Sequence, residues 1–343
     1  MKYELLIAAA TYYEGKTYLV PQGKKGNCLF EYDTVSDCMT EICSFSEYED
    51  YKFSPFSAII YSEGFIYLIT SNIDSIIVYN TLTTDVSKKE MPFDRDGMII
   101  SAEKAGDNIY MFDAKKPSIY LYNVMNNCFT EINSWVKDIK PYVFDNNDIF
   151  FRKQVIIQNG YLMIPFCNAN AALKLSVRTS DYEVIKFAGG INGYSGIVYK
   201  NGEYWLFPRR GNMNILCCDE HLKVLKRIKI KDPNKYFRCF GVIAEECSFI
   251  IFGVGTEKIQ IEDKEHIFFF RNNMELLYDG NIKIYTDVYE GKLFMKPKNG
   301  EEQSRKICVD MLGKDIDDIF KDEVLNENAR IDLKFLLQYV VNR

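Results

Sequence analysis

A segment of about 45 residues recurs from one end of this sequence to the other. Each copy contains a tight-turn residue, usually Gly, and an aromatic or large apolar residue three or four positions after it. The turn residues are Gly15, Gly64, Gly106, Gly160, Gly202, Cys247 and Gly291. A regular period of this length predicts stacked supersecondary units, because each unit buries its apolar faces against its neighbours.

A second mark follows most of these turns, namely an alternating apolar segment that is closed by Asp or Asn. It covers residues 29–33, 77–80, 119–123, 215–219 and 307–310. The alternation predicts β-strands, the glycines supply the positive φ of two-residue hairpins, and the Asp or Asn side chains open the next turn. Each copy is therefore interpreted as four antiparallel strands, and the chain as an all-β, seven-bladed β-propeller. Six blades are the alternative, because the copy around Cys247 has no turn glycine.

The repeats predict that the propeller occupies residues 1–314, after which the pattern changes. Ile316, Ile319, Phe320 and Val324 follow helical spacing, which predicts a short C-terminal helical tail over residues 315–343. The tail is expected to pack on the propeller and to cover the seam between the first and last blades. The alternative is a docking helix for a partner protein.

Two of the copies also resemble a known repeat. Residues 29–33 followed by 39–42, and residues 119–123 followed by 129–132, resemble the third and fourth strands of kelch repeats. The resemblance covers roughly residues 3 to 312. The Gly-Gly pair of kelch is absent, and Met39, Val86 or Phe129 stands where kelch has Trp. The chain therefore resembles a divergent kelch-like propeller.

The cysteines favour a reducing compartment. The chain has 10 Cys without a C-x-x-C pair, and several lie in apolar strands, which is typical of buried free thiols. It also has no Asn-x-Ser/Thr acceptor site and no convincing targeting or membrane-spanning segment. We expect a cytoplasmic protein without a membrane partner.

Composition excludes several kinds of chemistry. With only 2 His in the chain, a histidine-based metal centre or catalytic triad is not expected. The sequence has no phosphate-binding glycine loop, and its net charge of −6 disfavours nucleic acid as a partner. No cofactor, metal or catalytic residue is therefore predicted.

The loops that leave the second strands are expected to share one rim of the propeller with the segments that cross between blades, and we call this rim the mouth. The predicted ligand-binding residues of the mouth are Lys24, Lys115, Arg152, Asn168, Asn170, Tyr194, Arg209, Arg210, Asn212 and Lys296. Arg209 and Arg210 are the expected anchors, since a guanidinium group binds carboxylate or phosphate through paired hydrogen bonds. Acidic residues are expected on the same rim, so the alternative is a set of merely solvated charges.

These residues support a non-catalytic propeller that binds an anionic or sugar-like small molecule, or a protein segment, at a basic mouth. A second hypothesis is an enzyme, such as a lyase, an isomerase or a carbohydrate-active hydrolase, with its site in the central funnel. A third is a scaffold for protein–protein interaction. An enzyme is expected to place a carboxylate or a Tyr beside Arg209 or Arg210, whereas a binding protein need not.

Overall fold

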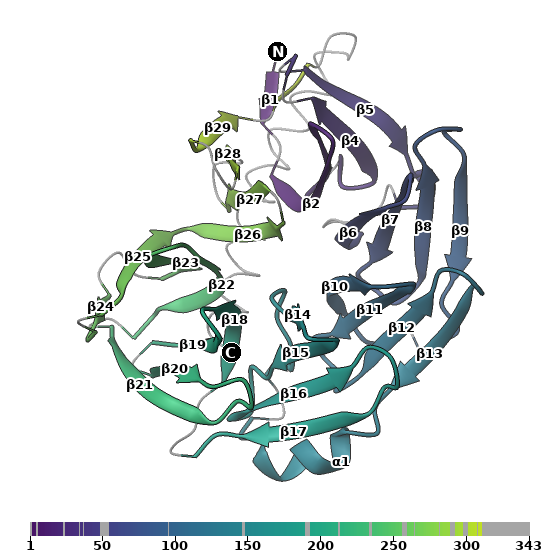
Figure 1. The fold of residues 1–343 in the computed structure, drawn as a ribbon. Helices are drawn as coiled ribbons and strands as arrows, with labels where there is room; N and C mark the ends of the chain where they lie inside the picture. The colour runs from purple at the N-terminus through teal and green to yellow at the C-terminus, as the bar shows by residue number, and fades with distance from the viewer. Residues whose placement is uncertain are drawn as a thin grey trace. The chain divides into compact units, whose positions relative to one another are not determined.

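The computed structural model describes residues 2–4, 6–22, 25–33, 35–36, 38–48, 55–94, 96–145, 148–188, 193–211, 213–232, 235–255, 259–263, 265–280, 282–288, 292–297, 301–306 and 308–310. Nearly all regular structure in these residues is β-strand, and the strands form seven blades (Figure 1). The chain is a seven-bladed β-propeller, as the repeat predicted, and the six-bladed alternative is wrong.

The first four blades follow the chain order. Blade 1 contains β2 (Ile7–Tyr13), β3 (Lys16–Pro21), β4 (Cys28–Asp33) and β5 (Cys38–Ser44), and blade 2 contains β6 (Phe56–Ser62), β7 (Phe65–Thr70), β8 (Ser75–Asn80) and β9 (Val86–Glu90). Blade 3 contains β10 (Ile99–Ala105), β11 (Asn108–Asp113), β12 (Ile119–Asn123) and β13 (Cys128–Ile132). Blade 4 contains β14 (Ile156–Gln158), β15 (Tyr161–Pro165), β16 (Ala171–Ser176) and β17 (Tyr182–Lys186).

The remaining blades are less regular. Blade 5 contains β18 (Tyr194–Lys200), β19 (Glu203–Pro208), β20 (Asn214–Cys218) and β21 (Val224–Lys231), with β24 (Gln260–Ile261) added at its edge. Blade 6 contains β22 (Arg238–Ala244), β23 (Ser248–Val254) and β25 (Ile267–Asn272). Blade 7 contains β26 (Met274–Asp279), β27 (Ile282–Asp287), β28 (Lys292–Pro297) and β29 (Gln303–Lys306).

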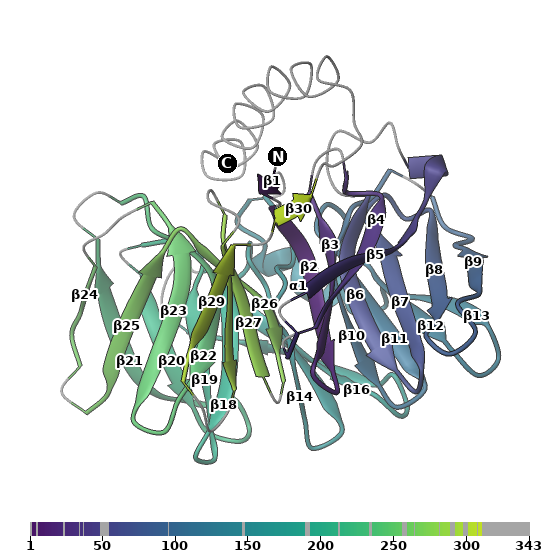
Figure 2. The ribbon, with the colours of Figure 1, turned by 90° about the horizontal axis from the view of Figure 1, so that it is seen from above.

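The chain divides into two compact units. Unit 1 comprises residues 1–63 and 277–343, and unit 2 comprises residues 64–276. Blades 3 to 6 lie wholly in unit 2, and Figure 2 shows their strands from above. The helices among the described residues are short: α1 (Val136–Ile139) and the 3-10 helices η3 (Lys140–Tyr142) and η2 (Ser46–Tyr48). The helical tail expected at residues 315–343 lies outside the described residues.

The predicted turn chemistry is present in both units. Four hairpins between first and second strands have positive φ at two consecutive residues, and the second of these is Gly15, Gly64, Gly160 or Gly202, with φ from 78° to 88°. A pair of positive φ angles matches the right-handed twist of the flanking strands, which explains why Gly recurs there.

The Asp and Asn residues that close the third strands also act as predicted. Asp33, Asn80, Asn123 and Asp219 each accept a hydrogen bond from the backbone N–H two residues later, at 2.8 to 3.2 Å. Each side chain thereby starts the turn into the fourth strand. The side chains that mark the repeat in the sequence are therefore the ones that build its turns.

Blade 6 departs from the four-stranded repeat. β22 pairs antiparallel with β23, but the third strand, β25, runs parallel to β23. A parallel neighbour requires the chain to cross over before it returns. Here the connection passes the edge of blade 5, where β24 pairs antiparallel with β21. The four-strand interpretation is therefore wrong for this blade.

Blade 7 also differs from the predicted repeat. The sequence placed β27 and β28 as first and second strands around the turn at Gly291, but they are the second and third strands of their sheet, and Gly291 lies outside the described residues. Residues 307–310 were predicted to be a third strand. Instead β30 (Cys308–Asp310) pairs antiparallel with β1 (Lys2–Glu4) within unit 1.

Aromatic side chains fill the core between blades 3 and 4. Trp135, Phe151 and Phe166 are fully buried, and their ring centroids lie 5.3 to 5.7 Å apart. Such a cluster stabilises through large buried apolar area together with edge and offset ring contacts. The cluster also fixes the crossing segment between the two blades, because Phe151 lies in that segment next to Arg152. No helix in the described residues is long and apolar enough to cross a membrane.

Candidate functional site

Three segments of unit 2 bring four arginines together. Arg152 lies in the segment that crosses from blade 3 to blade 4, Arg209 and Arg210 follow β19, and Arg238 begins β22. Backbone bonds join the last two segments: the N–H of Cys239 donates to the Arg209 carbonyl at 3.1 Å, and Arg210 and Arg238 form an isolated bridge. We call Arg152, Arg209, Arg210 and Arg238 the arginine cluster.

A single aspartate contacts two members of the arginine cluster. Arg210 donates from Nη2 to Oδ2 of Asp148 at 2.9 Å, and Arg209 forms an ion pair with Oδ1 of the same carboxylate. The Asp148 side chain is 2% exposed, and its Oδ1 also accepts from the N–H of Ile149 at 2.9 Å. Asp148 is therefore a buried and fixed counter-charge.

Several donors of the cluster have no hydrogen-bond partner among the described residues. The Arg209 side chain is 2% exposed, yet its Nε and Nη1 make no hydrogen bond, so its contact with Asp148 is an ion pair by distance only. The buried Nε of Arg152 and the buried Oδ1 of Asn168 also have no partner there. Buried polar groups normally have partners, and each exception needs an explanation, such as a ligand.

The arginines repel one another electrostatically. Burial, with the positive charge of Arg209 as the second cause, lowers the pKa of Arg152 below its ordinary range. Burial, followed by the charges of Arg210 and Arg209, lowers the pKa of Arg238 to about 10. Burial of these guanidinium groups beside each other therefore disfavours their charged form, and a bound anion would reduce that cost.

Packing fixes the position of Arg152. Its guanidinium carbon lies 4.7 Å from the centroid of the Phe240 ring, which is the geometry of a cation–π contact. Two residues further on, Gln154 donates from Nε2 to the Val242 carbonyl at 2.6 Å and accepts from the Val242 N–H at 2.9 Å. These bonds tie the crossing segment of blade 4 to the first strand of blade 6.

Two buried thiols lie beside the arginines. Burial raises the pKa of Cys167 to about 11 and that of Cys239 to about 12. Neighbouring arginines oppose this rise at both positions, but burial dominates. Both side chains are therefore neutral thiols at physiological pH, which does not favour a nucleophilic role, because the thiolate is the reactive form.

The amide residues predicted for the mouth mostly bind backbone atoms. Asn170 donates to the Phe187 carbonyl at 2.6 Å and accepts from the Tyr194 hydroxyl at 3.2 Å. Asn168 donates to the Asp145 carbonyl at 3.4 Å, and only its Oδ1 is left without a partner among the described residues. The hydrogen bonds of Asn170 and Tyr194 thus hold the loop in place. Asn168 keeps one buried oxygen that could accept a hydrogen bond.

Lys115 is the predicted lysine that the structure describes in unit 2, and it is not part of the arginine cluster. Lys115 is exposed in the loop after β11, where its backbone N–H donates to Asp113 at 2.8 Å. Lys296 was expected in a mouth loop but lies within β28 of unit 1, because this strand continues to Pro297. Lys24 and Asn212 lie outside the described residues.

The sequence prediction missed Asp148 and Arg238. A signal for Arg238 exists in the repeat: Phe151-Arg152 precedes the first strand of blade 4, and Phe237-Arg238 occupies nearly the same place in blade 6. Both phenylalanines are fully buried, so each anchors its arginine beside the loops that follow the second strands. No comparable signal marks Asp148, which is one of several acidic residues in a segment without periodicity.

A second charged cluster, which we call the Lys226 cluster, contains Lys226, Asp263, Glu265 and His266. Lys226 donates from Nζ to Asp263 and to Glu265, each at 2.7 Å, and Nδ1 of His266 lies 2.7 Å from the other oxygen of Asp263. Burial works against it, yet the bonds from Lys226 and His266 lower the pKa of Asp263 to about 2. The two carboxylates and His266 have the spacing of metal ligands, but the Lys226 ammonium group already occupies both carboxylates.

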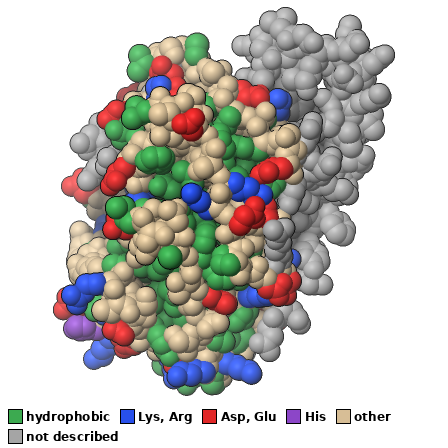
Figure 3. Space-filling model, turned by 90° about the vertical axis from the view of Figure 1, so that its right-hand side faces the viewer, with side chains coloured by type: hydrophobic (Ala, Val, Ile, Leu, Met, Phe, Trp, Pro, Cys, Tyr) green, Lys and Arg blue, Asp and Glu red, His purple; other side chains and the backbone are tan. Residues whose placement is uncertain are grey.

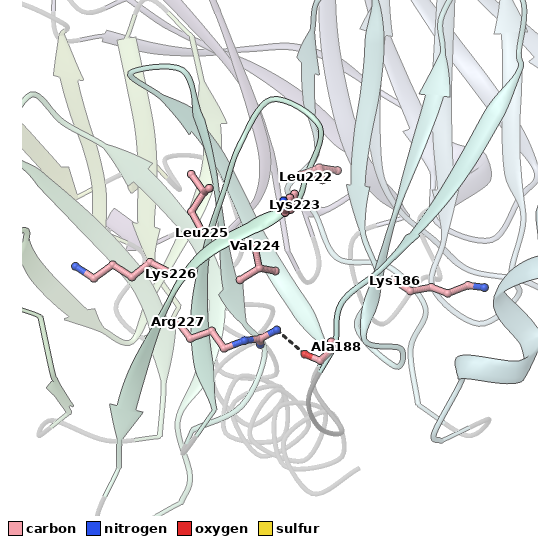
Figure 4. A pocket seen from close by; sticks show the side chains of 8 residues that line it. All are labelled: Lys186, Ala188, Leu222, Lys223, Val224, Leu225, Lys226 and Arg227. Atoms are coloured by element: carbon pink, nitrogen blue, oxygen red, sulfur yellow. Dashed lines mark hydrogen bonds between the residues drawn. The ribbon is translucent and has the colours of Figure 1, made fainter.

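A pocket of about 570 Å³ lies between β17 and β21, outside the arginine cluster (Figure 4). Lys186, Lys223, Lys226 and Arg227 are among the residues that line it. The ammonium groups of Lys186 and Lys226 point away from it, however, toward Tyr142 and Asp263 respectively, and Arg227 donates to the Ala188 carbonyl. Three of the four cationic groups that line the pocket, those of Lys186, Lys226 and Arg227, therefore already bind other groups of the protein.

Charge of both signs is mixed on the outer surface. On the face drawn in Figure 3, Lys and Arg side chains lie among Asp and Glu side chains. Ion pairs in blade 2 also join charges of opposite sign: Lys88 pairs with Asp74 at 3.5 Å and with Glu90 at 3.2 Å. A local excess of one sign, as in the arginine cluster, therefore contrasts with this face.

The comparisons with known proteins identify the fold. No protein-family model and no curated protein matches the chain. A catalytically inactive variant of virginiamycin B lyase from Staphylococcus aureus, solved with quinupristin, aligns at TM-score 0.54 and 11% identity over 90% of this chain and 88% of that chain. Dihydro-heme d1 dehydrogenase in complex with DHE aligns at TM-score 0.54 and 10% identity over 90% of this chain and 68% of that chain.

A third solved structure is the extracellular domain of a protein described as a one-component system from B. thetaiotaomicron. It aligns at TM-score 0.50 and 13% identity over 88% of this chain, and the present chain spans only 38% of its length. At such low identities these likenesses show the fold and not the activity. The chain is similar to propellers that bind ligands and to propellers that are enzymes, so its function has to be argued from its own residues.

Proposed function

We propose that this propeller is a binding protein for a small anionic ligand, which is held by the arginine cluster. The observation that carries the proposal is the concentration of arginine side chains in unit 2. Four guanidinium groups lie together, and Asp148 contacts two of them, Arg209 and Arg210. Burial of like charges beside each other is costly, so a site of this kind is best explained by an anion that binds there.

The open donors support the same proposal. Nε of Arg209 and Nε of Arg152 are buried and make no hydrogen bond to any described residue. Guanidinium groups bind carboxylate and phosphate through planar, paired donors, and this geometry gives specificity as well as affinity. Of the predicted residues, Arg152, Arg209 and Arg210 are therefore proposed to bind the ligand, Asn168 is proposed to accept from it, and Asn170 and Tyr194 to support the loop.

An enzyme is the second candidate, because Asp148 lies at hydrogen-bonding distance from Arg210. A general base, however, needs a lone pair directed at the substrate, whereas both oxygens of Asp148 are turned toward arginines. The neighbouring thiols are protonated. These observations favour binding over catalysis. A kelch-like ancestry, a sugar-like ligand and a cytoplasmic location remain proposals, and the last rests on the nine free cysteines among the described residues.

The test is a titration of purified protein with sodium salts of several small anions at constant ionic strength, followed by thermal unfolding and by calorimetry. The wild-type protein is compared with Arg209→Met, and with Arg178→Met as a matched control, because Arg178 is exposed in the turn between β16 and β17. We expect at least one anion to stabilise the wild type and the control but not Arg209→Met. Equal stabilisation of all three proteins would refute the proposal.

A further inference from the structure

We propose that the outer edge of blade 6 is a dimerisation surface, at which β25 pairs antiparallel with β25 of a second copy of this chain. The proposal is independent of the arginine cluster. It depends on three features of β25: its place at the edge of a three-stranded sheet, the exposed apolar side chains that it carries there, and the self-complementary order of its residues.

Blade 6 ends one strand earlier than the regular blades. Its sheet has the order β22-β23-β25 among the described residues, whereas blades 1 to 4 and blade 7 have four strands each. β25 therefore lies at the edge of its sheet, beside β23, where the regular blades add a fourth strand (Figure 1). An edge strand presents backbone N–H and C=O groups that can pair with a strand of another chain.

The side chains of β25 divide between two faces. Phe268 and Phe270 pack against the core cluster of blades 5 and 6, where the ring of Phe268 stacks on that of Phe249 with centroids 5.3 Å apart. Ile267 and Phe269 alternate with them and are 56% and 53% exposed. The buried pair holds the strand in place, so the exposed pair forms a fixed apolar surface.

Charged side chains protect the edge strands of the neighbouring regular blades, but not the exposed positions 267 and 269 of β25. Lys88 and Glu90 are exposed in β9, Glu131 in β13, and Lys186 in β17. Charge on an edge strand discourages pairing with another chain. An edge that exposes Ile and Phe instead is typical of a surface that a partner covers.

The order of residues in β25 favours a second copy of the same strand as the partner. When two copies pair antiparallel about a two-fold axis through Phe269, this residue lies opposite its own copy, and Phe268 lies opposite Phe270 of the second copy. Paired positions then differ by an even number, so exposed side chains stay on the exposed face. Cross-strand aromatic pairs of this kind stabilise a sheet.

The charges at the two ends of β25 are of opposite sign. Glu265, whose side chain is 70% exposed, precedes the strand, and Arg271 lies near its end. The two-fold pairing places the start of each strand beside the end of the other, so Glu265 of one copy becomes a diagonal neighbour of Arg271 of the other. A parallel pairing would instead bring like charges together. The antiparallel pairing also closes the assembly at two copies.

The first test measures the mass of the purified full chain by sedimentation velocity over a range of protein concentrations. The wild type is compared with Phe269→Lys, which places two ammonium groups opposite each other at the axis. The matched control is Val86→Lys, because Val86 is 48% exposed in the edge strand β9. We expect the wild type and the control to dimerise equally, and Phe269→Lys to dimerise about tenfold more weakly or not at all. Circular dichroism verifies that each variant is folded.

Disulfide cross-linking with a mild oxidant tests the register. A cysteine at position 269 would lie opposite its own copy, whereas a cysteine at position 267 would lie opposite Arg271 of the second copy. We therefore expect Phe269→Cys to form an intermolecular disulfide faster than Ile267→Cys. Both are compared with the wild type, whose own exposed cysteines set the background rate.

Several outcomes would overturn the proposal. A wild-type protein that stays monomeric at every concentration would leave the edge of blade 6 to a strand of a different protein, or to no partner. A dimer that Phe269→Lys leaves intact, or that Val86→Lys weakens equally, would have its interface elsewhere. A Phe269→Cys variant that cross-links no faster than Ile267→Cys would refute the pairing about Phe269.

Discussion

The arginine cluster and the Lys226 cluster lie in the same unit and are built from the same kinds of charged side chain, yet their charges are balanced differently. In the Lys226 cluster, Lys226 contacts two carboxylates and His266 contacts one of them, so each of these charges has a partner. In the arginine cluster Asp148 contacts two of the four guanidinium groups, and buried donors of Arg152 and Arg209 have no hydrogen-bond partner among the described residues. The first arrangement is complete as it stands, and the second is the one for which we propose an anionic ligand.

The location of each cluster explains the difference. The Lys226 cluster joins β21 to the residues between β24 and β25, where the chain passes the edge of blade 5 before it forms the parallel strand of blade 6. The ion pairs of the Lys226 cluster hold this connection in place, where the chain has no hairpin between neighbouring antiparallel strands. The arginine cluster lies where loops and crossing segments of blades 4 to 6 meet, which is where folds of this kind gather functional side chains.

The largest effect is expected from Asp148→Asn. This change removes the carboxylate that contacts the cluster, and the loss of one partner of a buried ion pair costs about 3–5 kcal/mol. We expect the free energy of unfolding to fall by this amount in buffer without multivalent anions, as measured by chemical denaturation. Added sulfate should restore most of the loss, because the variant gains net positive charge.

A smaller loss in Asp148→Asn, with no additional response to sulfate relative to the wild type, would contradict this view of the cluster. It would mean that the arginines find their counter-charges elsewhere.

The next effect concerns Arg209. Truncation of a buried charged group that binds a charged partner costs about 2–5 kcal/mol of binding energy. We expect Arg209→Met to weaken sulfate binding by about a hundredfold, measured by calorimetry. Its unfolding free energy without ligand should change little, since one of several repelling charges is removed and Arg210 still neutralises Asp148. Strong destabilisation without any change in binding would assign Arg209 a structural role.

A smaller effect, on stability alone, is expected from Asp263→Asn in the Lys226 cluster. The carboxylate loses charge-assisted bonds with Lys226 and His266, which corresponds to about 1–2 kcal/mol of unfolding free energy. Anion binding at the arginine cluster should not change. Thermal unfolding in the presence and absence of sulfate measures both quantities, and a changed response to sulfate would show that the two clusters are coupled.

The same aspartate predicts a dependence on pH. The pKa of Asp263 is about 2 in the folded protein, below its ordinary value of 3.8. Its contribution to stability is therefore complete above about pH 5 and is lost as the pH falls from 3.8 toward 2. The difference in unfolding free energy between wild type and Asp263→Asn should shrink over this range. A difference that stays constant down to pH 2 would contradict the assigned pKa.

The smallest effect is expected from Lys226→Met, because this ammonium group is partly exposed and surface ion pairs contribute little. We expect a slight destabilisation that salt reduces further. A loss larger than that of Asp263→Asn would show that Lys226, and not Asp263, organises the connection.

Comparison of the regular and irregular blades shows what could be predicted from the sequence. The turn glycines at 15, 64, 160 and 202, together with Asp33, Asn80, Asn123 and Asp219, act locally, so their spacing predicted the strands and the number of blades. Blade 6 could not be predicted in this way. Its third strand is parallel, and a parallel pairing is set by a crossover whose residues have no local signature.

In the candidate site, too, local features could be predicted from the sequence and long-range contacts could not. The sequence alone determined the repeat, the turn chemistry and the positions of Arg152, Arg209 and Arg210 in loops and crossing segments, because these depend on short-range backbone preferences. Only the tertiary structure decided that Asp148 contacts both Arg209 and Arg210, that Arg238 joins them, and that Lys226 pairs with two carboxylates while Nε of Arg209 has no hydrogen-bond partner among the described residues. Charge balance is a sum over residues that are distant in the chain, and the sequence does not contain their distances.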